Sequence, residues 1–148
     1  MKVVLQRVSR AKVEIEGEET REIGMGLMVL IGVMDGDTED DLKYITEKTA
    51  GLRIFDDENG VMNRSLMDVG GEMLLISQFT LLADTKKGKR PSYIAAGDPK
   101  IANAMYEKAA EIFRGKGIPV KTGTFGADMQ VSLTNNGPVT IIIDSRNR

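Results

Sequence analysis

The strongest constraint on the fold is a continuous apolar run, Gly-Leu-Met-Val-Leu-Ile-Gly-Val, at residues 26–33. A run of this length is typical of a strand buried on both faces in the centre of a sheet. Around Val3 and Val13 apolar and polar residues alternate, as they do in half-buried strands. Further strands are predicted at residues 72–81, 118–124, 127–134 and 139–144.

Two segments have the helical period instead. The first follows Thr38, which has Asp41 three residues later, and this spacing resembles a capping box. The second begins with Asp98-Pro99, an N-cap followed by a first-turn proline, and is stopped by Gly115 and Gly117. The buried faces are predicted to hold Leu42, Ile45, Thr49 and Leu52 in the first helix, and Ile101, Met105, Ala109 and Ile112 in the second.

The arrangement of these segments predicts the fold class. The 148 residues contain no internal repeat, low-complexity tract or Pro/Ser-rich linker, so we expect a single domain spanning residues 1–148. Strands outnumber helices, and the two types are mixed along the chain. This order favours an α+β fold in which curved antiparallel or mixed β-sheets form a barrel-like core, with two main helices packed outside.

The residue types that are missing restrict the chemistry. The chain has no His, no Cys and no Trp, which excludes a Ser-His-Asp triad, a Cys-His pair, disulfides and the usual zinc sites. Proton transfers in an enzyme of this composition must use Asp, Glu, Lys, Tyr, backbone dipoles, water or the substrate itself. An intrinsically labile bond is therefore the expected target. We expect no cofactor and no tightly bound metal, and only a weak Mg²⁺ accompanying RNA is left open.

Charge and hydropathy limit the partners and the location. The net charge is −2, whereas proteins that wrap nucleic acid carry a basic surplus, so any RNA contact should be local. No apolar run approaches the roughly 20 residues that cross a bilayer. Gln6 and Arg7 interrupt the first apolar stretch, which predicts no secretion signal. We expect a cytoplasmic protein that associates with neither membranes nor DNA.

Polar residues gather at the end of the strand predicted at residues 72–81. Ser77, Gln78 and Thr80 place two hydroxyls and an amide beside Phe79. A lone Ser or Thr in a strand usually bonds to nearby backbone, but three polar groups within four residues favour a pocket. The basic loop that follows carries four cations that could contact phosphates, although such a run is usually just solvated: Lys86, Lys87, Lys89 and Arg90.

Two further segments have unusual turn chemistry. Asn136-Gly137 between apolar segments is a strong hairpin signal, but Pro138 disturbs it. From the residues alone, an ordinary trans turn is expected there. In residues 125–129 the small pair Gly126-Ala127 permits close approach of a ligand or another backbone, and a bulge at a strand corner is the simpler interpretation.

Taken together and in order, these segments resemble the D-aminoacyl-tRNA deacylase family of bacteria and eukaryotes. Residues 77–81 with Ala83-Asp84 resemble its first signature motif, and residues 136–140 resemble the second. The agreement covers essentially the whole chain at the family's usual length and spacing. It includes Gln6-Arg7-Val8, Gly51-Leu52-Arg53-Ile54-Phe55, Arg90-Pro91-Ser92 and Phe125-Gly126-Ala127-Asp128-Met129-Gln130-Val131.

The resemblance implies a homodimer with two equivalent sites at the subunit interface. The Gly137-Pro138 peptide is expected to be cis and to enter the partner subunit's pocket. There its carbonyls would admit the α-hydrogen of a D-amino acid, exclude an L-side chain and let achiral glycine pass. Arg7 would hold this motif. The terminal adenosine of the tRNA would lie near Ser77, Gln78 and Phe79, beside a substrate-binding region formed by Gly126, Ala127 and Met129.

Two mechanisms for hydrolysing the ester of D-aminoacyl-tRNA follow from this resemblance. In one, the hydroxyl of Thr80 attacks the ester, but no histidine can activate it. In the other, which we favour, the terminal 2′-OH of the tRNA helps to activate or position a water, and backbone N–H groups near Phe79 and Thr80 stabilise the oxyanion. The alternatives are a tRNA 3′-end binding module without turnover, and a small amidase or esterase acting on free D-amino acid derivatives.

Overall fold

The computed structural model describes all residues from Met1 to Arg148. Two helices and a short 3-10 turn accompany eight strands. The elements, in chain order, are β1 (Lys2–Glu14), β2 (Arg21–Ile23), β3 (Gly26–Gly32), α1 (Glu39–Gly51), β4 (Phe55–Asp56), β5 (Met62–Arg64), β6 (Glu72–Ser77), η1 (Phe79–Leu82), α2 (Pro99–Gly115), β7 (Val120–Thr122) and β8 (Gln130–Asp144). Neither helix is long and apolar enough to span a membrane.

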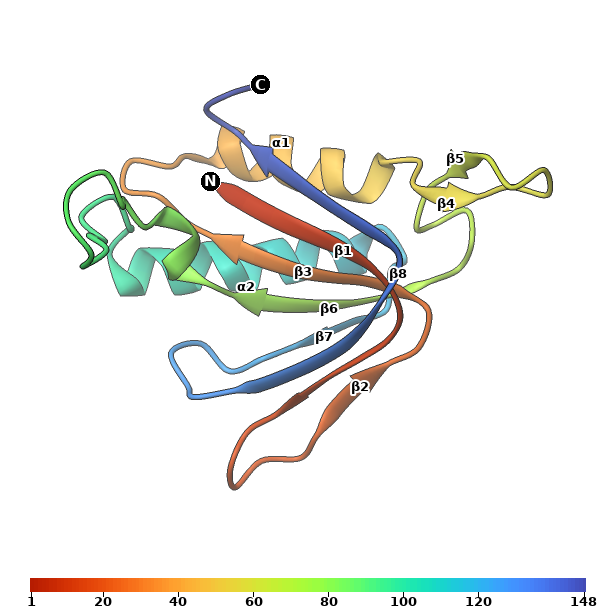
Figure 1. Ribbon diagram of the computed structural model, residues 1–148, viewed down its shortest axis with the longest axis horizontal. Coiled ribbons are helices and arrows are strands. Elements are labelled where there is room, and N and C mark those ends of the chain that lie inside the picture. Colours follow the sequence, from red (N-terminus) through yellow and green to blue (C-terminus); the bar gives the residue numbers. More distant parts are fainter.

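The main sheet is mixed and strongly curved. Its order is β2-β1-β3-β6-β7, and β8 pairs with β1 along almost its whole length. Strand β1 is antiparallel to β2, β3 and β8, whereas β3–β6 and β6–β7 are parallel pairs. Figure 1 shows β1 and β8 bending together. Beyond the bend, the second half of β1 and the first half of β8 form two arms that curl over one face of the sheet. The expected α+β fold, with a mixed sheet nearly closed into a barrel and two helices outside, is confirmed.

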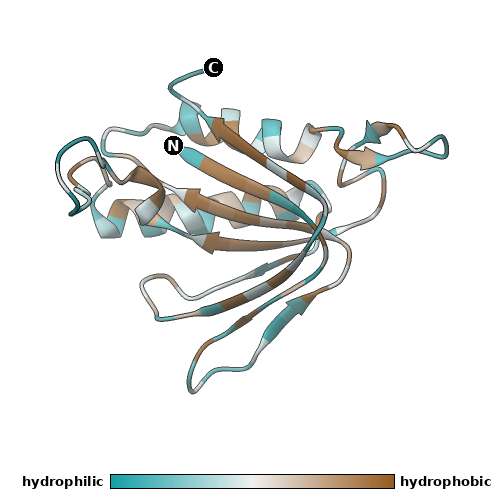
Figure 2. Cartoon of the chain, viewed as in Figure 1, coloured by the Kyte–Doolittle hydropathy of each residue, from teal (hydrophilic) through white to brown (hydrophobic).

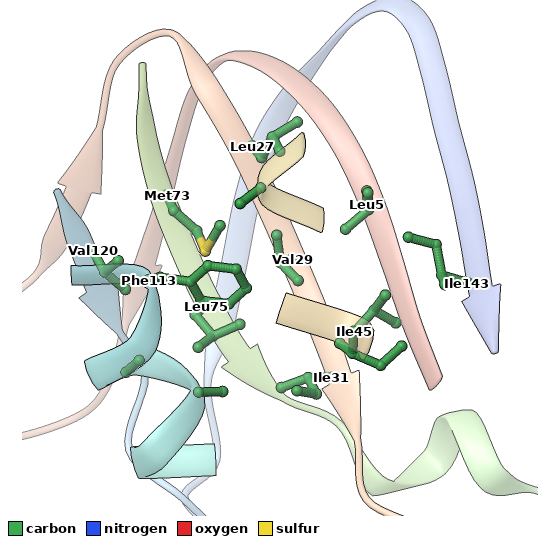
Figure 3. Packing of buried hydrophobic residues seen from close by; sticks show 14 of the residues in the cluster. Leu5, Leu27, Val29, Ile31, Ile45, Met73, Leu75, Phe113, Val120 and Ile143 are labelled. Atoms are coloured by element: carbon green, nitrogen blue, oxygen red, sulfur yellow. The ribbon is translucent and has the colours of Figure 1, made fainter. Parts of the chain in front are cut away.

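Burial of apolar side chains explains this arrangement. One core cluster lies between the sheet and the two helices, with residues such as Leu5, Val29, Leu75 and Phe113 at its centre (Figure 3). A smaller cluster fills the opposite side, where the curled arms of β1, β2 and β8 cover residues such as Met28. The run predicted as a central strand is β3, and the hydropathy colouring of Figure 2 shows it as apolar throughout.

The helices begin where the sequence predicts, but one of them faces the core differently. Thr38 donates its backbone N–H to the carboxylate of Asp41 at 2.9 Å, and Asp98 caps α2 through the N–H of Lys100. The predicted stripe on α2 is right for Ala109, which is fully buried, but Ile101 is 57% exposed and Met105 and Ile112 are only partly buried. The face that is buried contains Ala102, Tyr106, Ala109, Ala110 and Phe113.

Two strand predictions are also corrected. Strand β6 ends at Ser77 instead of continuing to Leu81, so the polar cluster lies at a turn and not within a buried strand. The backbone N–H of Gln78 still bonds to Ile31 O at 2.8 Å, and the chain then turns into η1. Gly32 permits this turn, because a Cβ there would lie 3.0 Å from Gln78 O. The segments predicted as two strands at residues 127–134 and 139–144 form one strand, β8.

Candidate active site

A cavity of about 430 Å³ opens where β6 ends. This volume is within the range of small-molecule sites. It is bounded by the end of β6, η1, the start of α2 and the turn before β8, and its walls are mainly apolar. The lining residues are Val33, Ser77, Phe79, Tyr93, Ala96, Gly97, Pro99, Ala102, Phe125 and Gly126. Other hollows of about 290 to 480 Å³ contain neither Ser77 nor Phe79.

The rim of the cavity carries the predicted polar cluster. Ser77 faces the cavity, whereas Thr80 is exposed on the adjoining turn, with its Oγ1 accepting a hydrogen bond from the side-chain amide of Gln78. Phe79 is 55% exposed and meets Tyr93 edge-on, with 5.1 Å between ring centroids. This aromatic pair gives the rim an apolar face beside hydroxyl groups. Such a combination suits a flat, partly polar ligand.

The opposite wall is formed by the turn that joins β7 to β8. Gly126 has φ +77° and lines the cavity, and the N–H of Ala127 bonds to Thr124 O. The predicted strand-corner bulge is therefore a connecting turn. Ala127 is half-buried beside the lining. Met129 packs in the smaller core cluster, outside the cavity lining, so a direct substrate contact for it remains a prediction.

A buried tyrosine supports this wall from below. Tyr106 on α2 donates its hydroxyl to Leu75 O at 2.6 Å, and its ring lies 6.3 Å from that of Phe125. Burial raises the pKa of Tyr106 to about 12. The neutral phenol therefore acts as a fixed donor that ties α2 to β6. Sequence reasoning missed both this tie and the lining residue Tyr93, although an aromatic residue between a basic loop and an N-cap is a usable signal.

The other predicted functional segment, Gly137-Pro138, forms a bend in β8. The peptide bond between these residues is cis, as the family resemblance implies, and the ordinary trans turn expected from the residues alone is wrong. Register shifts opposite Gln6 and Val8 interrupt the ladder to β1 at this point. The side chain of Asn135 connects the two sides of the bend, because its Oδ1 accepts a hydrogen bond from the N–H of Val139 at 3.2 Å.

Arg7 lies next to the bend and bonds to its backbone. It is only 8% exposed, donating from Nε to Asn136 O at 3.0 Å and from Nη1 to Ile54 O at 2.8 Å. The same guanidinium lies 3.4 Å from the carboxylate of Asp56. A Cβ on Gly137 would lie 3.0 Å from Arg7 Nη2 and 2.9 Å from Val139 Cγ2. Glycine is therefore required where the bend rests on the guanidinium.

In a single chain the bend and the cavity do not meet. The cavity begins at Ser77 of β6, which is in register with Ile31 of β3 and Val3 of β1. The bend of β8 lies opposite Arg7 of β1, four residues further along that strand. Four residues of strand correspond to about 13 Å, and the three strand spacings from β8 to β6 add about 14 Å sideways. Figure 1 shows the bend and η1 at opposite ends of the sheet.

The basic loop extends from the rim on the far side of η1. Backbone hydrogen bonds in both directions between Asp84 and Ser92 close its base. Its four cations are exposed and form no ion pair within the chain: Lys86, Lys87, Lys89 and Arg90. Their assignment to phosphate contacts remains a prediction.

These features define a class of protein: a small α+β domain with an apolar cavity whose rim carries hydroxyl, amide and aromatic groups. A rigid backbone bend lies at the other end of its sheet. The chain contains no cluster of three or more residues suited to hold a metal ion.

Comparison with known proteins identifies the family. Residues 4–144 match the family model described as D-Tyr-tRNA(Tyr) deacylase. The chain is 55% identical over 149 residues to a D-aminoacyl-tRNA deacylase of Parabacteroides distasonis, covering 100% of this chain and 99% of that protein. It is 56% identical over 146 residues to one of Bacillus pumilus, covering 99% of each. The chain therefore belongs to the D-Tyr-tRNA(Tyr) deacylase family and is an enzyme of the deacylase class.

Solved structures agree with this placement. One titled c-Myc DNA Unwinding Element Binding Protein superposes with a TM-score of 0.91 at 41% identity, covering 97% of this chain and 98% of that one. Another, titled as a structural analysis of a probable eukaryotic D-amino acid tRNA deacylase, has a TM-score of 0.83 at 18% identity and covers 96% and 97% of the two chains. The second likeness concerns the fold alone.

Proposed function

We propose that this protein hydrolyses the ester bond of D-aminoacyl-tRNA, releasing the free D-amino acid and tRNA while rejecting L-aminoacyl-tRNA. The terminal adenosine occupies the cavity next to Ser77 and Phe79, and the ester lies at Thr80. The observation that carries this proposal is the position of Ser77, Phe79 and Gly126 around one cavity in a chain of this family.

The active unit is a homodimer, because one copy cannot place the bend at its own cavity. Support comes from the sheet face opposite the helices, where Leu30, Val4 and Ile142 form a row across β3, β1 and β8. Ile142 is 71% exposed, and such an apolar row on an open sheet face is suited to association. Packing this face against its copy, with the strands of the two copies antiparallel, brings each bend to the partner's cavity.

The bend selects handedness by exclusion. The carbonyls of Gly137 and Pro138 face the α-carbon, accept hydrogen bonds from the amino group and leave room only for hydrogen on the side where an L-residue carries its side chain. Arg7 keeps the bend rigid, which exclusion requires. Because glycine has no side chain to collide, glycyl-tRNA is a second substrate.

The reaction uses water and the RNA itself. The 2′-OH of the terminal ribose positions or activates a water, and the backbone N–H groups of Phe79 and Thr80 stabilise the oxyanion. An aminoacyl ester is already labile, so the protein must supply less catalysis than a peptidase does. A direct attack by Thr80 lacks a base, since its Oγ1 is paired only with the amide of Gln78.

The test is a paired deacylation assay with D-Tyr-tRNA and L-Tyr-tRNA. Rapid loss of the D-ester with the L-ester intact is the expected result. Binding of both without turnover would instead indicate a 3′-end binding module. Equal turnover of a D-aminoacyl ester lacking adenosine would indicate an esterase of free D-amino acid derivatives. DNA is not proposed as a partner, because the net charge is −2.

A further inference from the structure

A hairpin formed by β4 and β5 projects beyond the bend at one end of the molecule (Figure 1). It carries three carboxylates, Asp56, Asp57 and Glu58, against one guanidinium, Arg64, which pairs with Glu58 at 2.6 Å, and Asp56 lies 3.4 Å from Arg7. The side chain of Glu58 is 71% exposed. Backbone N–H groups of Val61 and Asn59 lower the pKa of Asp57, and its own backbone N–H together with the guanidinium of Arg64 lowers the pKa of Glu58, so both are ionised at neutral pH. The hairpin is thus an acidic projection.

The basic loop of residues 84–92 projects from the opposite end of the molecule, beyond η1. It has four exposed cations against one carboxylate, and none of the cations is paired within the chain. The chain therefore carries projections of opposite charge at its two ends. Within one copy they lie too far apart to neutralise each other.

The order along the long axis of the molecule relates these projections to the active site. From one end to the other, Figure 1 shows the hairpin, the bend of β8, then η1 and the basic loop. An antiparallel pair of copies that places each bend at the partner's η1 also places each hairpin, which lies just beyond the bend, at the partner's basic loop. The hairpin is fixed in position next to the bend, because Arg7 bonds both to Asn136 O at the bend and to Ile54 O just before β4.

We propose that the acidic β4–β5 hairpin of one copy binds the basic loop of a second copy and so aligns each bend with the opposite cavity. This inference rests on the proposed homodimer. Opposite charges across such an interface fix its register and speed its assembly. The rival partner for the loop is RNA phosphate. The hairpin is favoured because the chain itself supplies the complementary charge at the required place, whereas its net charge of −2 opposes broad RNA binding.

The experiment uses two single charge reversals on exposed residues, Glu58→Lys in the hairpin and Lys87→Glu in the loop. Each is expected to weaken the full-length dimer about tenfold, as measured by analytical ultracentrifugation at low salt, because each creates two like-charge contacts per dimer. The double variant regains wild-type affinity. Mixing the two single variants yields mainly heterodimers, since only the mixed pair has opposite charges at both contacts.

Matched controls are Glu107→Lys on α2 and Lys43→Glu on α1, which change the net charge equally on exposed helical positions and should leave the dimer intact. If the loop binds RNA phosphates instead, Lys87→Glu weakens tRNA binding but leaves dimer affinity unchanged, and Glu58→Lys does not restore it. That result, or the absence of preferential heterodimers, overturns the inference while the wild-type dimer and its turnover stand. A monomeric wild-type enzyme would instead refute the proposed dimer itself.

Discussion

Replacing Gly137 with alanine is the most direct test of the bend. The new Cβ would lie 2.9 Å from Val139 Cγ2, 3.0 Å from Arg7 Nη2 and 3.1 Å from Val139 N, which is closer than ordinary contact. Crowding of this kind typically costs about 1–3 kcal/mol. The backbone φ of +132° is unfavourable for any residue with a Cβ and adds about 1–3 kcal/mol. We therefore expect Gly137→Ala to lower the free energy of unfolding by about 2–6 kcal/mol, or to displace the bend.

A matched control separates crowding from backbone conformation. Gly117, after α2, has φ +87°, but a Cβ there meets nothing within 4 Å. Gly117→Ala should therefore cost only the backbone penalty, about 1–2 kcal/mol. Urea unfolding of both variants at one fixed protein concentration gives the difference, because the stability of the proposed dimer would depend on concentration.

The activity of the same variant tests the function of the bend. If the crowding moves the bend, Gly137→Ala lowers kcat/KM for D-Tyr-tRNA by at least tenfold and reduces the ratio of D- to L-turnover, whereas Gly117→Ala preserves both. An alanine at position 137 that is no more costly than one at position 117, with unchanged stereoselectivity, would refute the account of a rigid bend resting on Arg7.

Three more outcomes are expected. Arg7→Lys replaces the two nitrogens that bond to Asn136 O and Ile54 O by a single ammonium, so it should cost about 1–2 kcal/mol in urea unfolding and lower the D-to-L turnover ratio about tenfold. Thr80→Ala should reduce kcat less than tenfold in single-turnover assays, and near-complete loss would favour direct attack by the hydroxyl. Tyr106 has its pKa raised to about 12, so the folded state holds this proton after the unfolded chain loses it near pH 10, and about 2–3 kcal/mol of stability is lost between pH 10 and 12. Tyr106→Phe should remove that slope from a series of unfolding curves, whereas an unchanged slope would assign it to other groups.

The sequence predicts the fold class well because period and capping are local properties. The capping pairs Thr38–Asp41 and Asp98–Lys100 lie within three residues, and both helices start beside them. The buried face of α2 is less predictable, because the sheet selects it. The face that is buried combines alanines such as Ala109 with the aromatic residues Tyr106 and Phe113, while Ile101 is left outside. A prediction from helical spacing alone therefore finds Ala109 but not the rest of this face.

The same limit applies to the site. The motif around Ser77 could be recognised from its residue types, but the end of β6 depends on Gly32 of a neighbouring strand, which leaves room for the turn at Gln78. Likewise Tyr93 joins the cavity because its loop returns to earlier parts of the chain, where Tyr93 meets Phe79 and the N–H of Gly97 bonds to Val33 O. These are contacts between segments far apart in the chain. No periodicity within either segment reveals them.

The absence of histidine and the position of Gly137-Pro138 have a common physical explanation in the proposed mechanism. With no imidazole to exchange protons, the protein can contribute shape and fixed backbone dipoles, and both require rigid backbone. Rigidity is what Arg7, Asn135 and the curled arms of β1 and β8 supply at the bend. A rigid bend cannot fold back onto a cavity in its own chain at the other end of the sheet. In the proposed function, association of two copies therefore brings the bend of each to the ester in the cavity of the other.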